Sequence, residues 1–78
     1  MIVTTQSYRG YVSTISQDPE EPGFAVDFPD IPEIITSHDT LAGAFANACE
    51  ALDLYLETLE NLGRPFPKSH HRLVVQTP

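Results

Sequence analysis

The side chains of this chain that could do chemistry are one cysteine, three histidines and eleven acids. Cys49 falls on the apolar face of an expected helix, where a buried and unreactive thiol is the usual state. His38 is far in the sequence from His70 and His71, and that adjacent pair points in opposite directions if extended, so there is no local metal motif. There is also no glycine-rich phosphate loop. We therefore expect no catalytic residue, no metal site and no cofactor, and we interpret the chain as a protein that is not an enzyme.

The acidic residues are concentrated in the middle of the chain, which has a formal net charge of −7. All eleven lie between Asp18 and Glu60, and none of the four basic residues lies in that stretch. Such an acidic block repels phosphate backbones, so we expect no direct binding of nucleic acid. It would attract a basic protein partner. The other interpretation is that the acids only keep a small domain soluble.

One long helical pattern runs from Thr40 to Leu62. At ~100° of rotation per residue, its apolar residues share a wide face and its acidic residues lie on the opposite side. Asp39 or Thr40 is the expected N-cap, and Gly63 fits the left-handed position after the last turn. Leu54 breaks the pattern because it points outward among the acids, either as a tolerated surface leucine or as a contact with another chain.

Four other segments are rich in β-branched and aromatic residues, which favour strands: 8–17, 24–28, 33–37 and 72–77. The first two should pair antiparallel across the proline- and glycine-containing connection at 18–23. Phe24, Val26 and Phe28 share a face that should meet the helix. Residues 1–7 either extend the first strand or fray. The elements predict an α+β fold of order β-β-β-α-β, with an antiparallel sheet of three to four strands and the helix packed on one face.

We expect residues 1–78 to form a single domain that rests on a small core, because one cysteine cannot form an internal disulfide. A small core favours self-association, so we expect a homodimer or homotetramer. Three apolar residues are the candidates for that contact: Leu54, Leu73 and Val75. The sequence contains no apolar run of membrane-spanning length and no signal peptide, which predicts a cytoplasmic protein without a membrane anchor.

Several segments in order resemble the N-terminal domain of HicB-family antitoxins. They are Gly23 to Pro32 with its Pro-Asp-Ile-Pro, the Asp39-Thr40-Leu41 entry to the helix, the Asn47-x-x-Glu50-Ala51-Leu52 core, and the Gly63-x-Pro65-x-Pro67 exit. The resemblance covers roughly residues 8–69. Glu33 and His38 stand where the family usually has glycine, so the bend between them should differ from that of the family. The family also often carries a C-terminal DNA-binding domain, for which these residues leave no room.

The resemblance implies a partial ribonuclease-H-like fold and a module that binds and masks a small basic ribonuclease toxin, HicA. If such a toxin binds, charge and expected exposure favour seven contact residues: Asp18, Glu20, Glu21, Asp30, Glu33, His38 and Asp39. The alternative is a stand-alone, self-associating domain with a structural or regulatory role.

Overall fold

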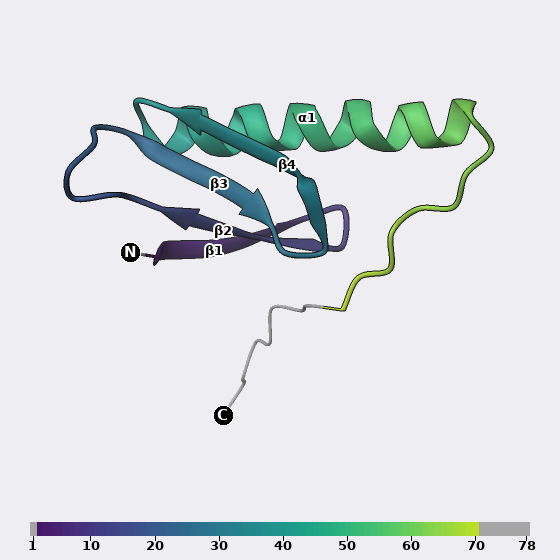
Figure 1. Cartoon of the computed structure of the whole chain (residues 1–78), viewed down its shortest axis with the longest axis horizontal. Helices are drawn as coiled ribbons and strands as arrows, with labels where there is room; N and C mark the ends of the chain where they lie inside the picture. Colours follow the sequence, from purple (N-terminus) through teal and green to yellow (C-terminus); the bar gives the residue numbers. More distant parts are fainter. Residues whose placement is uncertain (1, 71–78) are drawn as a thin grey trace.

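A computed structural model describes residues 2–70 of the chain. Within this range, four strands form one antiparallel sheet in the order β1-β2-β3-β4, and one helix follows them. The elements are β1 (Ile2–Tyr8), β2 (Tyr11–Ser16), β3 (Phe24–Phe28), β4 (Ile31–His38) and α1 (Leu41–Asn61). The helix lies along the sheet and contacts β3 and β4 (Figure 1). This confirms the predicted α+β class, with the order β-β-β-β-α across the described residues.

The predicted first strand, 8–17, is wrong in its first part, because the chain turns back after Tyr8. Arg9 and Gly10 have φ angles of 54° and 86°, and they form a two-residue connection between β1 and β2. Positive φ at both central residues matches the right-handed twist of the paired strands, which is why such turns close hairpins. Residues 2–8 therefore neither extend the expected strand nor fray, and they form the separate strand β1.

The strands 24–28 and 33–37 are confirmed, the second of them as part of the longer β4. β2 and β3 pair antiparallel as expected. β3 and β4 are joined by a tight turn at Pro29 and Asp30, after which the register shifts between the pairs Phe28↔Ile31 and Asp27↔Ile35. Residues 32–34 lie within this irregularity, and an irregularity of this kind bends a strand. The expected strand 72–77 lies outside the described residues.

The ends of α1 are capped as its sequence predicts. Thr40 is the N-cap, and its Oγ1 accepts a hydrogen bond of 3.0 Å from the Gly43 N–H. At the other end Gly63 has a φ of 68°, and the Arg64 N–H donates to the Leu59 carbonyl at 2.9 Å. These bonds satisfy backbone groups that a helix otherwise leaves without partners.

The core lies between the sheet and one face of α1. The helix contributes the buried residues Ala44, Ala48, Leu52 and Leu56. The sheet contributes Tyr11, Ile15, Val26, Phe28, Ile31 and Ile34, and Phe24 packs at the margin. The prediction that the face shared by Val26 and Phe28 meets the helix is therefore confirmed. Ala44 and Ala48 are small, so they leave room for these larger side chains between the helix and the sheet.

Candidate partner-binding surface

One end of the sheet carries an open acidic pocket. Phe24 pairs with His38 in the β3–β4 register, so the loop before β3 and the junction after β4 lie next to each other. Asp18, Glu21, His38 and Asp39 line the pocket, which has a volume of about 650 Å³. Pro22 and the half-buried Phe24 also line it. Four of the seven residues predicted to contact a partner are thus brought together here, and Glu20 lies in the same loop.

The acidic residues at this end of the sheet differ in whether they take part in hydrogen bonds within the chain. Asp18 Oδ1 accepts a hydrogen bond of 2.9 Å from the Glu20 N–H, and the Asp18 carbonyl accepts one of 3.2 Å from the Glu21 N–H. Asp18 therefore shapes the loop. Within residues 2–70, the carboxylates of Glu20, Glu21 and Asp39 have no hydrogen-bond or ion-pair partner, and all three residues are exposed. These three charges are available to a partner without the loss of an internal bond to a described residue.

His38 has an internal role at the start of α1. Its Nδ1 accepts a hydrogen bond of 3.2 Å from the Thr40 N–H and lies 3.3 Å from Thr40 Oγ1. Its ring also lies against Gly43, where an added Cβ would collide with His38 Nδ1. The glycine in the first turn of the helix is therefore explained by the close approach of His38.

Asp30 and Glu33 lie at the opposite end of β3 and β4, away from the acidic pocket. Asp30 Oδ2 accepts a hydrogen bond of 2.9 Å from the His70 N–H. Glu33 Oε2 accepts one of 2.7 Å from the Tyr55 hydroxyl, and this bond raises the pKa of Tyr55 above its ordinary value. The seven predicted residues therefore form two separate groups, and both acids of the second group already accept internal bonds.

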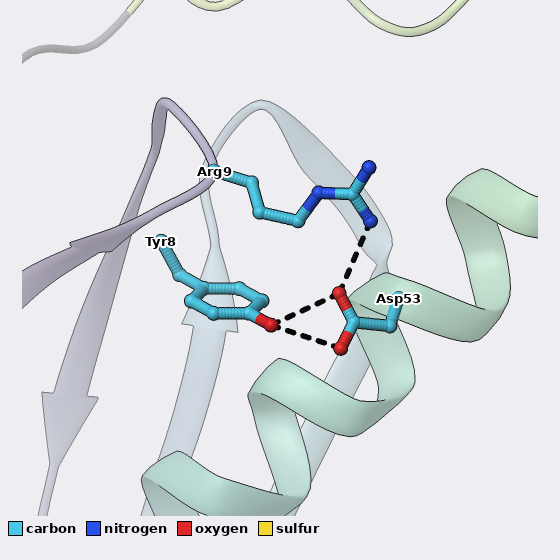
Figure 2. A network of polar contacts seen from close by, with 3 residues as sticks. All are labelled: Tyr8, Arg9 and Asp53. Carbon is cyan, nitrogen blue, oxygen red and sulfur yellow. Dashed lines mark hydrogen bonds and ion pairs between the residues drawn. The ribbon is translucent and has the colours of Figure 1, made fainter.

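A polar network that the sequence did not indicate joins the β1–β2 turn to the middle of α1 (Figure 2). The Tyr8 hydroxyl donates to Asp53 Oδ2 at 2.9 Å and to Oδ1 at 3.1 Å, and Arg9 Nη1 contacts Asp53 Oδ1 at 3.1 Å. The bond to Asp53 is the main cause that raises the pKa of Tyr8. Asp53 follows the helical pattern of solvated acids, and more than forty residues separate it from its partners, so no local signal pointed to this contact.

The remaining candidates are isolated side chains. Leu54 is 65% exposed on α1, as its position in the helical pattern predicts, whereas Leu73 and Val75 lie outside the described residues. Cys49 is half-buried, and burial raises the pKa of its thiol, which disfavours the reactive thiolate.

Two features are absent from the described part of the chain. It holds no group of three His, Cys, Asp or Glu side chains placed to bind a metal ion. Within residues 2–70, no helix has both the length and the apolar character that crossing a bilayer requires.

This chain is similar to known proteins of the HicB-like antitoxin family. Residues 11–76 match the family model described as HicB_like antitoxin of bacterial toxin-antitoxin system. The chain is 36% identical over 72 residues to Antitoxin HicB of Escherichia coli strain K12, an alignment that covers 87% of this chain and 51% of the relative. It is 40% identical over 63 residues to Antitoxin HicB 2 of Photorhabdus laumondii, covering 76% of this chain and 44% of the relative.

This chain thus spans about half the length of the curated relatives it matches. No solved structure matches. The family match begins at Tyr11, so β1 and its turn lie outside the matched residues.

Proposed function

This chain belongs to the HicB-like antitoxin family, and from that membership we propose that it is a protein-binding module of a toxin–antitoxin system. In this proposal it neutralises a small, basic ribonuclease toxin of the HicA type by covering the toxin's RNA-binding surface. The observation that carries the proposal is the family match, which spans residues 11–76. The role is one of binding and masking, and it requires no catalytic residue in this chain.

The charge distribution supports a basic partner. The chain has a net charge of −7, and the acidic residues that line the pocket are exposed to solvent. Opposite charge accelerates the encounter with a basic protein, and the same charge repels RNA. An acidic surface can therefore dock on the face of a toxin that binds a phosphate backbone.

We assign the first contact to the acidic pocket. Glu21 and Asp39 of the pocket, and Glu20 in the adjoining loop, are exposed carboxylates without described partners, and they would pair with basic side chains of the toxin. Asp18 and His38 hold the loop and the helix start in place beside them. Asp30 and Glu33 would form a second flank, where binding competes with their bonds to the His70 N–H and the Tyr55 hydroxyl.

The proposal requires a basic HicA-type toxin encoded beside this chain. The test is co-expression with that toxin, read out as growth rescue and as the dissociation constant of the purified complex. The triple variant Glu20→Lys/Glu21→Lys/Asp39→Lys should lose growth rescue and bind at least ~100-fold more weakly, because attraction becomes repulsion at the contact. For the natural chain, the rate of association with the toxin should fall as ionic strength rises.

The matched control is Glu50→Lys/Glu57→Lys/Glu60→Lys, which makes the same charge change on the exposed back of α1. It should retain rescue and most of the affinity. Equal losses in both variants would contradict the assignment of the contact to the pocket. A natural chain that binds no such toxin would contradict the proposed function itself.

A further inference from the structure

β1 is an edge strand whose outer side is open among the described residues. Within residues 2–70 it pairs with β2 alone (Figure 1). Tyr8 and Tyr11 flank the two-residue turn, so they form a hydrogen-bonded pair of the hairpin. Because such pairs alternate, Gln6 also directs its backbone groups to β2, consistent with the bond from Ser13 Oγ to the Gln6 carbonyl at 2.9 Å. Thr5 and Ser7 therefore direct their N–H and C=O groups outward, away from the sheet.

This edge lacks the features that usually prevent pairing with another strand. Residues 2–8 include no charged side chain and no proline. The opposite edge, β4, contains Pro32, Glu33 and a register shift. Features that prevent pairing with another strand are therefore present along β4 and missing along residues 2–8 of β1.

Charge indicates which occupant fits. All eleven acids of the chain lie between Asp18 and Glu60, so β1 is where two copies of an acidic protein approach with little repulsion. A basic partner gains little attraction there, because residues 2–8 carry no charged side chain and the Asp53 carboxylate that Tyr8 contacts is already paired with Arg9. An uncharged strand that pairs antiparallel with its own copy also gives a closed two-fold contact.

We propose that two copies of this chain pair antiparallel through β1, with the two-fold axis at Gln6, so that their sheets become continuous. In this register Thr5 faces the partner's Ser7, and Ser7 faces the partner's Thr5. All outward backbone groups of both residues then bond across the contact.

If the two-fold axis lay one residue earlier or later, outward residues of β1 would face irregular backbone of the partner. An axis at Thr5 would place Ser7 opposite the partner's Val3, where the pairing of β1 with β2 is already irregular. An axis at Ser7 would place Thr5 opposite the partner's Arg9, which has a φ of 54° and lies in the turn. The axis at Gln6 stays within the regular part of the strand.

Cysteine cross-linking tests this register on the full chain, in a Cys49→Ser background and without an N-terminal tag. At the proposed axis the two residues at position 6 form a non-hydrogen-bonded pair with Cα atoms ~4.5 Å apart, within the range of ~4.4–6.8 Å that a disulfide spans. Gln6→Cys should therefore oxidise to a covalent dimer on a non-reducing gel.

Thr5→Cys is the matched control, because its partner in this register is position 7 and its own copy lies diagonally, ~7–8 Å away. It should cross-link at least ~10-fold more slowly than Gln6→Cys. Equal or reversed rates would overturn the register.

Light scattering tests the contact without a cross-link. The natural chain should approach twice its monomer mass of 8.6 kDa as its concentration rises. Thr5→Pro removes an N–H that points away from the sheet and leaves the hydrogen bonds between β1 and β2 intact. This variant should therefore remain monomeric with an unchanged circular dichroism spectrum. Thr5→Val keeps the N–H and should still dimerise.

Amide exchange gives the same answer residue by residue. In the natural chain, the Thr5 and Ser7 amides should become protected from exchange as the dimer forms. In Thr5→Pro, the remaining Ser7 amide should exchange freely. A natural chain that is monomeric at every concentration would overturn the proposal. So would a dimer that survives Thr5→Pro, or protection of these amides in the monomer.

Discussion

At the scale of single residues, Asp53 connects parts of the chain that are remote in sequence. Its carboxylate accepts the Tyr8 hydroxyl and pairs with Arg9, so one side chain on α1 holds the last residue of β1 and the first residue of the β1–β2 turn (Figure 2). The ion pair is about half-exposed and contributes at most about 1 kcal/mol. The location of the ion pair matters more than its strength. Arg9 has a φ of 54°, which is uncommon for a residue other than glycine, and the bond to Asp53 helps to hold it in this conformation.

The Tyr8–Asp53 bond predicts a pH dependence of stability. This bond raises the pKa of Tyr8, so the folded chain holds the phenolic proton more tightly than the unfolded chain does. The stabilisation is complete below the ordinary tyrosine pKa of about 10 and is lost as pH rises above it. Urea unfolding at neutral and alkaline pH should therefore show that the difference in stability between the natural chain and Tyr8→Phe narrows above that pKa. A constant difference across this range would contradict the role of the bond.

At the scale of elements, the junction between β4 and α1 is built around one close approach. His38 ends β4, its ring accepts the Thr40 N–H, and the same ring occupies the space beside Gly43. The first turn of the helix thus contains a residue of low helix propensity, because a larger one would displace the ring. Since His38 and Asp39 also line the acidic pocket, the geometry of that pocket depends on this junction.

A double-mutant cycle at Gly43 tests this explanation. In the natural chain, Gly43→Ala should fail to stabilise the protein, because the new Cβ meets the His38 ring and offsets the gain in helix propensity. In a His38→Ala background the same change should stabilise by up to about 1 kcal/mol. Denaturant unfolding of the four proteins measures the coupling. Equal effects of Gly43→Ala in both backgrounds would show that the ring does not restrict position 43.

At the scale of the whole molecule, a small two-layer domain carries a large excess of negative charge. Eleven acids stand against four basic residues, and Arg9–Asp53 is the one ion pair within residues 2–70. Repulsion among the remaining carboxylates opposes folding of the chain into a compact domain. The same repulsion keeps two copies of the chain apart, except where their surfaces are uncharged. The acidic pocket and the uncharged edge of β1 thus favour different partners.

This charge excess predicts that salt stabilises the fold. Raising the ionic strength from ~0.01 M to ~0.1 M shortens the Debye length from roughly 30 Å to 10 Å and screens the repulsion. The midpoint of thermal unfolding should rise over that range of sodium chloride, at fixed protein concentration. The Glu50→Lys/Glu57→Lys/Glu60→Lys chain, whose net charge is about −1, should show a much smaller rise. An equal rise in both proteins would point to a cause other than charge repulsion.

The sequence alone determined those features that depend on neighbouring residues. The bounds of α1 follow from Thr40, Gly63 and the helical spacing of apolar residues, and β3 follows from the alternation of Phe24, Val26 and Phe28. The exposure of Leu54 and the resemblance to antitoxins also came from local patterns. Capping, periodicity and turn residues act over a few positions, so they can be interpreted without a tertiary structure.

Only the tertiary structure decided which of these local features meet. The β3–β4 register brings Asp18 and Glu21 to His38 and Asp39, and it places Asp30 at the other end. The hairpin at Arg9 and Gly10, and its attachment to Asp53, were likewise absent from the local pattern. Strand pairing and contacts between distant side chains depend on a register summed over the whole sheet, and no short stretch of sequence contains that information.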